Sequence, residues 1–477
     1  MLDKNNTKKN SQTIIPREPT LIEALISLVS LITGIGVSIA FYGLDPHVPM
    51  LLGAIIASLI AFKCGYSWIA VQKAMVNGIS QTLPTVMILI LIGLLIGVWV
   101  LAGVVPTLIY YGLQFLSPTY FLPTTLIICA VASLATGSSW GTTGTIGIAL
   151  MSIGGSLGFP TPIVAGAVLS GAYFGDKISP LSDTTNLAAS MAGTELYAHI
   201  RHMLNTSSVA FGLTLVIEIV LNKYYANNTV DLVQIDTIMT SLQDNFLISP
   251  ILLLPVIVLM VSSYKRVPAL PGIVLGLFSA IVVGVLLQGN TYEQIVSVSF
   301  AGFSSETNNP AVDELLSRGG MESMLYTISL VIVAMMFSGI MDQTGQLKVI
   351  IKRVLDRINS SRSLIVTSSL TTIVSNLILC EQYMSVVMGA RSYSQAYKDQ
   401  GLHSKNLSRV VEDCGTVTAN LVPWSSGGAY QAGVLGVATL AYLPFAFFCW
   451  ISPLVSIIYG LLNINIVKIE DDPDTQL

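Results

Sequence analysis

The sequence predicts an all-α polytopic membrane protein built from two repeats of inverted topology. Three observations support this prediction: few charged residues, apolar runs long enough to cross a bilayer, and a set of features that recurs in the second half of the chain. Hydrophobic residues make up 53% of the 477 residues and charged residues only 10%, whereas soluble proteins carry about 25% charged residues. Lipid is therefore the expected solvent for most of the chain.

Long apolar runs mark the membrane-spanning helices. Runs at 85–105, 267–287 and 325–341 approach or exceed the ~20 residues that a helix needs to cross ~30 Å of hydrocarbon. Counted loosely over the whole chain, such runs predict about ten to thirteen membrane segments. The polar, basic residues 1–20 are expected to stay on the cytoplasmic side, and residues 466–477 form a second polar tail.

Three features of the first half recur in the same order in the second half. The matched pairs are Val48–Gly53 with Val267–Gly272, Ala102–Gly103 with Ser338–Gly339, and Asp176–Asp183 with Asp413–Asn420. Duplication followed by divergence explains all three matches together. The domain organisation that follows is a first membrane repeat at 21–225, a linker at 226–245 and a second membrane repeat at 246–465.

The distribution of Lys and Arg indicates that the two repeats are inserted in opposite orientations. Residues 154–162 carry no charge, whereas the corresponding stretch of the second half, 391–409, is rich in Lys and Arg. Because Lys and Arg near helix ends mark the cytoplasmic side, equivalent loops are expected on opposite sides. Inverted repeats of this kind place the substrate site near the middle of the bilayer, between the repeats.

Two segments in corresponding positions interrupt the apolar sequence, at 135–145 and 374–382. Irregular backbone at membrane depth survives only where protein or a water-filled cavity supplies hydrogen-bond partners. The two segments therefore predict broken helices or re-entrant hairpins. The alternative is that their small residues merely let two helices pack closely.

Carboxyl groups within apolar stretches indicate an ion or proton pathway, because an acid at membrane depth costs roughly 2.5 kcal/mol or more even on a lenient insertion scale. Asp176, Asp183 and Asp413 rank first since they lie in the repeated motif, and Glu381 follows. Sodium prefers several oxygen ligands, so it is predicted to bind at Asp176, Asp183 and Asp413. The full set of predicted ion- or proton-binding residues is Asp176, Asp183, Asp413, Ser179, Thr416, Asn420 and Glu381.

Further polar residues in these segments are predicted to line the path of a cation or a substrate. They are Ser138, Ser139, Thr142, Ser375, Asn376, Ser425 and Ser426. Lys177 offers a competing explanation for the presence of acids at membrane depth, because it could form a purely structural ion pair with Asp176 or Asp183. The four histidines are predicted to lie in loops, so a buried histidine relay is not expected.

Competition between sodium and protons for one set of carboxylates is the minimal mechanism of an antiporter. Each ion neutralises the site enough to let it change sides, whereas the empty, charged site does not move. The sequence has no G-x-x-x-x-G-K-[ST] loop for a nucleotide and no basic block for nucleic acid. We therefore expect a transporter that is not an enzyme and needs no cofactor. A channel is the rival class, and it would dissipate one gradient without moving a second ion.

The block Gly175–Ala188, preceded by Thr136–Gly141, resembles the signature of the NhaC family of sodium/proton antiporters. In length and hydropathy the resemblance covers nearly the whole chain. It implies a multi-pass exchanger of the bacterial inner (plasma) membrane with the inverted repeats and hairpins of the wider ion-transporter superfamily. The expected partners are the lipid bilayer, sodium and protons, and a homodimer is one option.

The resemblance leaves the transported species open. The same family includes exchangers of malate with protons for lactate with sodium, and relatives associated with amino acids. Sodium/proton antiport is the main prediction. A sodium- or proton-coupled organic anion exchanger, or an amino-acid transporter on the same fold, is the alternative.

Overall fold

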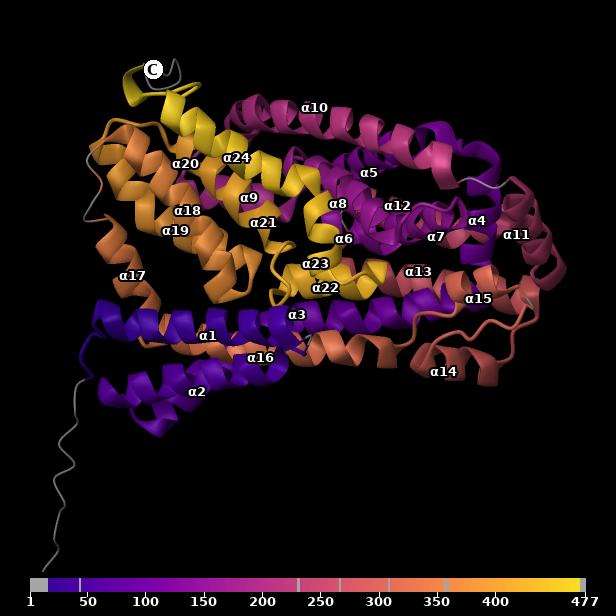
Figure 1. Ribbon diagram of the computed structural model, residues 1–477, viewed down its shortest axis with the longest axis horizontal. Helices are drawn as coiled ribbons and strands as arrows, with labels where there is room; N and C mark the ends of the chain where they lie inside the picture. Colours follow the sequence, from indigo (N-terminus) through magenta and orange to yellow (C-terminus); the bar gives the residue numbers. More distant parts are fainter. Residues whose placement is uncertain are drawn as a thin grey trace, which may run out of the picture. The chain divides into compact units, whose positions relative to one another are not determined.

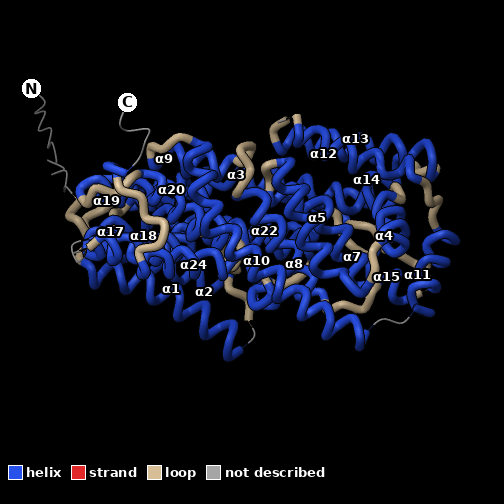
Figure 2. The backbone as a smooth tube through the Cα atoms, turned by 90° about the horizontal axis from the view of Figure 1, so that it is seen from above, coloured by secondary structure: helices blue, strands red, loops and turns tan. Residues whose placement is uncertain are grey.

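The structure, a computed structural model, describes residues 16–42, 44–229, 232–265, 267–307, 309–355, 358 and 360–471. Within these residues all regular secondary structure is helical and no strand is present (Figure 2). One isolated antiparallel bridge pairs Leu402 with Lys468. The all-α prediction is confirmed.

The chain divides into two compact units. One comprises the chain up to Ser80 together with Met335–Asp356, and the other comprises Gln81–Ala334 together with Arg357–Leu477. Two long helices, α3 (Trp68–Leu101) and α16 (Met321–Gln343), contribute residues to both units.

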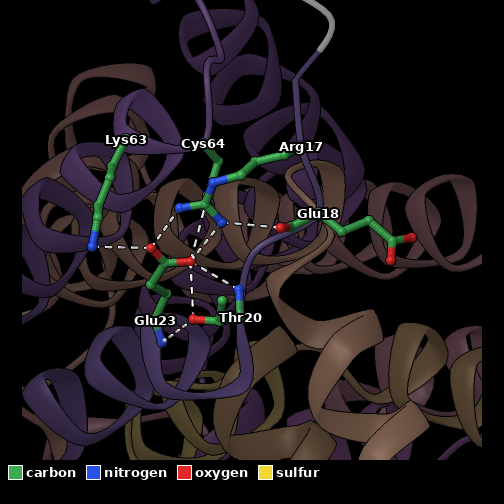
Figure 3. A network of polar contacts seen from close by, with 6 residues as sticks. All are labelled: Arg17, Glu18, Thr20, Glu23, Lys63 and Cys64. Carbon is green, nitrogen blue, oxygen red and sulfur yellow. Dashed lines mark hydrogen bonds and ion pairs between the residues drawn. The ribbon is translucent and has the colours of Figure 1, made fainter.

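The first unit contains α1 (Leu21–Tyr42), α2 (His47–Lys63) and α17 (Gln346–Leu355), and α1 packs against both of the others. A polar network around Glu23 ties the start of α1 to the end of α2 (Figure 3). Nη2 of Arg17 donates to the Glu23 carboxylate at 2.6 Å, and Nζ of Lys63 lies 3.1 Å from the same oxygen.

The second unit holds the remaining helices (Figure 1). Before α16 they are α4 (Val104–Phe115), η1 (Pro118–Tyr120), α5 (Phe121–Thr136), α6 (Ser139–Thr142), η2 (Thr143–Gly147), α7 (Ile148–Ser156), α8 (Thr161–Lys177), α9 (Asp183–Ala192), α10 (Leu196–Thr229), α11 (Leu232–Asn245), η3 (Pro250–Leu253), α12 (Leu254–Tyr264), α13 (Ala269–Val283), η4 (Gly284–Gln288), α14 (Tyr292–Ala301) and α15 (Pro310–Leu316).

After α17 the second unit resumes, and its helices are α18 (Ser361–Leu379), α19 (Gln382–Asp399), α20 (Ser404–Val411), η5 (Glu412–Thr416), α21 (Val417–Ala419), α22 (Ser426–Leu435), α23 (Thr439–Tyr442), η6 (Leu443–Phe445), α24 (Phe447–Leu462) and η7 (Ile469–Asp471). Three short elements of the second unit, η2 and η4 before α16 and η5 after α17, are π-helical. Segments of π-helix inside α-helices are often found at functional sites.

Seven helices in the described part of the chain are long and apolar enough to cross a membrane, or up to nine if each of two bent helix pairs counts as one span. The apolar runs singled out in the sequence fall on α3, on α13 with η4, and on α16. The total is lower than the predicted ten to thirteen. One reason is that the apolar helices α2 and α4 have only 17 and 12 residues, fewer than the ~20 of a full span.

Four of the breaks between described helices of the second unit lie at or next to the segments and motifs that the sequence singled out. They lie between α5 and α6, between α8 and α9, between α18 and α19, and between α21 and α22. The first and third are the breaks that the sequence predicted, and both are confirmed. The chain turns through left-handed backbone at Gly137 (φ 68°) in the first and at Cys380 (φ 56°) in the third.

Each break ends at a side chain that caps the next helix by accepting a hydrogen bond from the backbone N–H three residues on. The capping residues are Ser138, Ser182, Glu381 and Ser425. The two caps are 44 positions apart in each half, 138 to 182 and 381 to 425. This equal spacing favours duplication, although the two repeats and their inverted orientation stay predictions.

The capping residues also define a register between the halves. It pairs positions 243 apart (138 with 381), whereas Asp176 and Asp413 are 237 apart (176 with 413). Asp176 and Asp413 are therefore not equivalent positions in this register. The motifs that contain them are similar in sequence, but they lie at different distances from the helix breaks.

Helix α8 holds the central residues of the repeated motif in place. It runs beside α5 and α24 (Figure 1). Glycines let α8 approach α5 closely: a Cβ at Gly171 would lie 2.8 Å from Cβ of Cys129, and one at Gly175 would lie 2.7 Å from the backbone nitrogen of Leu134. The end of α8, with Asp176 and Lys177, is buried as a result.

Candidate ion-binding site

Asp176 lies in the last turn of α8 and faces the first helix break. Its side chain is 3% exposed. The Oδ2 atom accepts hydrogen bonds from the backbone N–H of Ser139 at 3.0 Å and from the Ser139 hydroxyl at 2.6 Å. Oδ1 has no hydrogen-bond partner among the described residues. One carboxylate oxygen is therefore available to an ion.

Lys177, the next residue, forms an ion pair with Asp413 of η5, and both side chains are fully buried. Nζ of Lys177 also donates to Oγ of Ser452 at 2.8 Å, and the Thr206 hydroxyl donates to the second oxygen of Asp413 at 3.0 Å. The competing explanation, in which Lys177 forms an ion pair with Asp176 or Asp183, is therefore wrong. Successive helix residues point about 100° apart, so Asp176 and Lys177 face different neighbours.

Glu412 is a buried carboxylate that the sequence analysis missed. Its side chain is 0% exposed. The Thr184 hydroxyl donates to Oε1 at 3.1 Å, and Oε2 lacks a hydrogen-bond partner in the ranges that the structure covers. The available signal was its position directly before Asp413, in a stretch that reads Val-Val-Glu-Asp-Cys-Gly.

The first turn of α9 connects Glu412 to the end of α8. The Thr185 hydroxyl donates to the carbonyl oxygen of Lys177 at 3.0 Å, while the neighbouring Thr184 reaches Glu412. Glu412 consequently lies within electrostatic range of both Asp176 and Lys177. Two acids with a free oxygen each, Asp176 and Glu412, therefore flank one ion pair.

Asp183 lies on the wall of a cavity of about 330 Å³ and within electrostatic range of Asp176. Its side chain is exposed, in contrast to Asp176 and Glu412. The Tyr383 hydroxyl donates to its Oδ2 at 2.6 Å, and the N–H of Thr184 donates to its Oδ1 at 2.8 Å. Because the cavity is also lined by residues of the first helix break, it gives access to the region of Asp176.

Glu381 lies where the two breaks of the second half meet. Its Oε2 accepts from the N–H of Met384 at 3.0 Å, and the Ser426 hydroxyl donates to Oε1 at 3.4 Å. The N–H of Ser426 also donates to the carbonyl oxygen of Cys380 at 2.8 Å. The two breaks of the first half touch in the same way, since a Cβ at Gly137 would lie 2.6 Å from Cβ of Leu181.

Most of the other predicted residues bind the backbone of the broken helices. Ser138 and Ser425 are helix caps. Hydroxyl or amide groups donate to backbone carbonyls at three further positions: Ser179 to Leu134, Ser375 to Thr371, and Asn420 to Val417, each at 2.8 Å.

Three predicted residues remain. Asn376 donates from Nδ2 to the carbonyl oxygen of Gly415 at 2.6 Å and to the Thr418 hydroxyl at 2.8 Å, which joins α18 to η5. Thr142 is buried directly before the π-helical η2, and Thr416 is buried as the last residue of the π-helical η5.

The three aspartates ranked first in the sequence do not converge on one point. Asp176 faces Ser139, Asp183 faces the cavity, and Asp413 is paired with Lys177. In the part of the chain that the structure covers, no group of three or more His, Cys, Asp or Glu side chains could hold one metal ion. Asp176 instead lies within electrostatic range of both Asp183 and Glu412.

Three of the four histidines lie in helices, so the prediction that all four lie in loops is wrong: His47 is the first residue of α2, and the other two lie in α10. His199 and His202 lie in α10 and are 0% and 6% exposed. Nδ1 of His199 is 2.8 Å from the Ser408 hydroxyl. The prediction failed because the polar start of α10 resembles a loop in sequence, whereas packing against α20 buries it.

A family model described as the Na+/H+ antiporter family matches residues 6–173 and 171–464 of the chain. Similar proteins include the malate-2H+/Na+-lactate antiporter of Bacillus subtilis, 39% identical over 93% of this chain and 95% of that protein. The Na+/H+ antiporter NhaC of Alkalihalophilus pseudofirmus is 37% identical over 89% of this chain and 92% of that protein. An uncharacterised Na+/H+ antiporter of Haemophilus influenzae is 36% identical over 95% of this chain and 98% of that protein.

Proposed function

This chain belongs to the Na+/H+ antiporter family, and on that premise we propose that its buried carboxylates exchange sodium for protons across the bacterial plasma membrane. The observation that carries the proposal is the pair of free carboxylate oxygens, Oδ1 of Asp176 and Oε2 of Glu412, beside the buried Lys177–Asp413 ion pair. The exchange needs no cofactor, because sodium and protons are themselves the substrates.

The charge balance of the site gives the reason for coupling. Lys177 neutralises Asp413, but no second cation is hydrogen-bonded to Asp176 or Glu412 among the described residues. An uncompensated buried carboxylate is very unfavourable, so Asp176 and Glu412 stay charged only while a cation is bound. A proton or a sodium ion can each supply the missing charge, and binding of one therefore displaces the other.

The ligands around these acids suit sodium. Carboxylate oxygens and the hydroxyls of Ser139 and Thr184 are hard oxygen donors, and no thiol or imidazole is required. The cavity that Asp183 lines would bring the ion to the helix break from solvent. Asp183 then acts at the entrance, while Asp176 and Glu412 form the inner site.

An organic anion exchanger, the function printed for the Bacillus subtilis malate/lactate relative, is the second candidate. The cavity beside the first helix break is mostly apolar, and its charged lining residue in the described ranges is the acidic Asp183. Such a cavity repels an anion, which favours plain sodium/proton exchange.

The test uses purified protein in proteoliposomes that contain a pH dye, with an outward sodium gradient. We expect internal acidification without any organic acid, and its loss in Asp176→Asn and in Glu412→Gln. The control Glu293→Gln, which changes an exposed carboxylate, should exchange like the wild type. Flux that appears only after malate or lactate is added would instead make the organic acid the substrate. Proton leakage that needs no sodium would indicate a channel.

A further inference from the structure

One face of α10 leads from the end of the helix to the ion pair. His199, His202 and Thr206 are three and four residues apart, a spacing that places side chains on the same face. All three are buried. The Thr206 hydroxyl donates to Asp413 at 3.0 Å, so the inner end of this face contacts the Lys177–Asp413 pair directly.

The outer end of the face lies near water. Arg201, beside His202, is exposed, and Glu195 just before α10 accepts hydrogen bonds from the N–H groups of Tyr197 and Ala198. Basic residues near helix ends mark the cytoplasmic side. The face therefore connects the cytoplasmic surface with the site.

The buried polar groups along this face are incompletely paired. His199 uses Nδ1 with Ser408, but its Nε2, the Nε2 of His202, and the Nε and Nη2 of Arg409 have no hydrogen-bond partner among the described residues. Buried polar atoms are nearly always paired, and buried water commonly supplies the missing partner. Three neighbouring side chains with free nitrogens suit a short file of water molecules.

We propose that His199 and His202 form a proton relay between the cytoplasmic surface and the Lys177–Asp413 pair. A proton from water binds Nε2 of one imidazole, and the proton on Nδ1 of the same ring then leaves through hydrogen-bonded water toward the Lys177–Asp413 pair, so the ring ends neutral. The same two transfers in reverse carry a proton outward to the surface and restore the first tautomer. The relay rests on the proposed sodium/proton exchange and names the route by which its protons arrive.

The charges around His199 and His202 favour passing a proton on over holding it on the imidazole ring. Lys177 faces His199, and Arg409 and Lys405 act on His202. Two further elements contribute titratable groups near this face of α10. Asp413 of η5 lies at the end of the face that contacts the ion pair, and the Tyr459 hydroxyl of α24 donates to the carbonyl oxygen of Asn205. The nearby cations repel a second positive charge, so a proton passes through the imidazoles without remaining there.

The test compares His199→Gln, His202→Gln and the double variant with the wild type in proteoliposomes between pH 6 and 9. Glutamine keeps hydrogen-bonding capacity but cannot take up and release a proton. We expect the double variant to lower the proton flux on the order of tenfold or more and to change its pH profile. Sodium binding, measured as sodium-induced thermal stabilisation, should stay unchanged. His47→Gln in α2 is the matched control and should behave like the wild type.

A second variant, Ser408→Ala, keeps both imidazoles but removes the hydroxyl at Nδ1 of His199. It should shift the pH profile with a smaller loss of flux. A wild-type flux and pH profile in the double variant would overturn the relay while leaving antiport intact. Parallel loss of sodium binding and flux would assign the histidines a structural role and also overturn it. Absence of sodium-driven flux in the wild type would instead overturn the proposed function.

Discussion

Lys177 and Asp413 depend on each other because both are fully buried. Removing one partner of a buried ion pair leaves an uncompensated charge and costs about 3–5 kcal/mol, whereas replacing both by apolar residues is often neutral. We expect Asp413→Leu to destabilise the protein strongly and the double variant Lys177→Met/Asp413→Leu to regain much of that stability. Thermal unfolding in detergent measures both. Equal unfolding temperatures for the single and double variants would mean that the pair does not stabilise the fold.

The same double variant separates stability from function. If Asp413 receives the transported proton, the rescued protein should remain inactive in the proteoliposome assay. Full exchange by the double variant would remove Asp413 from the proton pathway.

Thr184 holds the carboxylate of Glu412 through its hydroxyl. Thr184→Val keeps the shape but removes this hydrogen bond and one oxygen near the proposed sodium ligands. We expect the KM for sodium to rise about tenfold or more, since a neutral-to-charged hydrogen bond contributes roughly 1.5–3 kcal/mol. Thr184→Ser, which keeps the hydroxyl, is the control. An unchanged KM in the valine variant would place sodium away from Glu412.

At the scale of elements, the helix breaks depend on backbone that few residues adopt. Gly137 has φ 68°, and a Cβ there would lie 2.6 Å from the Cβ and the carbonyl carbon of Leu181. Gly137→Ala should therefore destabilise the protein by about 1–3 kcal/mol and lower exchange, since the two breaks of the first half would separate. Gly212→Ala, in α10 with nothing within 4 Å of the added Cβ, is the control.

Circular dichroism and thermal unfolding check this prediction. We expect Gly212→Ala to be neutral or slightly stabilising, because alanine favours helix more than glycine. If Gly137→Ala unfolds at the same temperature as Gly212→Ala, the contact between the two breaks does not contribute to stability.

At the scale of the whole molecule, the inverted orientation of the repeats can be tested by topology. We expect reporter domains fused at Asp231 and at Lys398 to report opposite sides of the membrane. Asp231 lies outside the described residues, and Lys398 is exposed in the last turn of α19. The same side for both positions would end the argument from the charge distribution, although the equal 44-position spacing of the caps (138 to 182, and 381 to 425) would still need an explanation.

Features that depend on composition and local pattern could be predicted before the fold was known. Low charge and long apolar runs predicted a helical membrane protein, because helices satisfy their own backbone hydrogen bonds in lipid. Clusters of small and polar residues predicted the breaks near Gly137 and Cys380, since a local sequence controls where a helix ends. The motif around Asp176 indicated the family, because it is a short stretch of contiguous sequence.

The pairing of charged residues, in contrast, could be read only from the packing of the helices. Lys177 pairs with Asp413, 236 positions away, and no periodicity in the sequence encodes that distance. Thr184 of α9 contacts Glu412, and the histidines of α10 are buried where α20 packs against that helix. The energy of a buried charge depends on its neighbours in space, so the partners of these groups are fixed by packing between helices and not by local sequence.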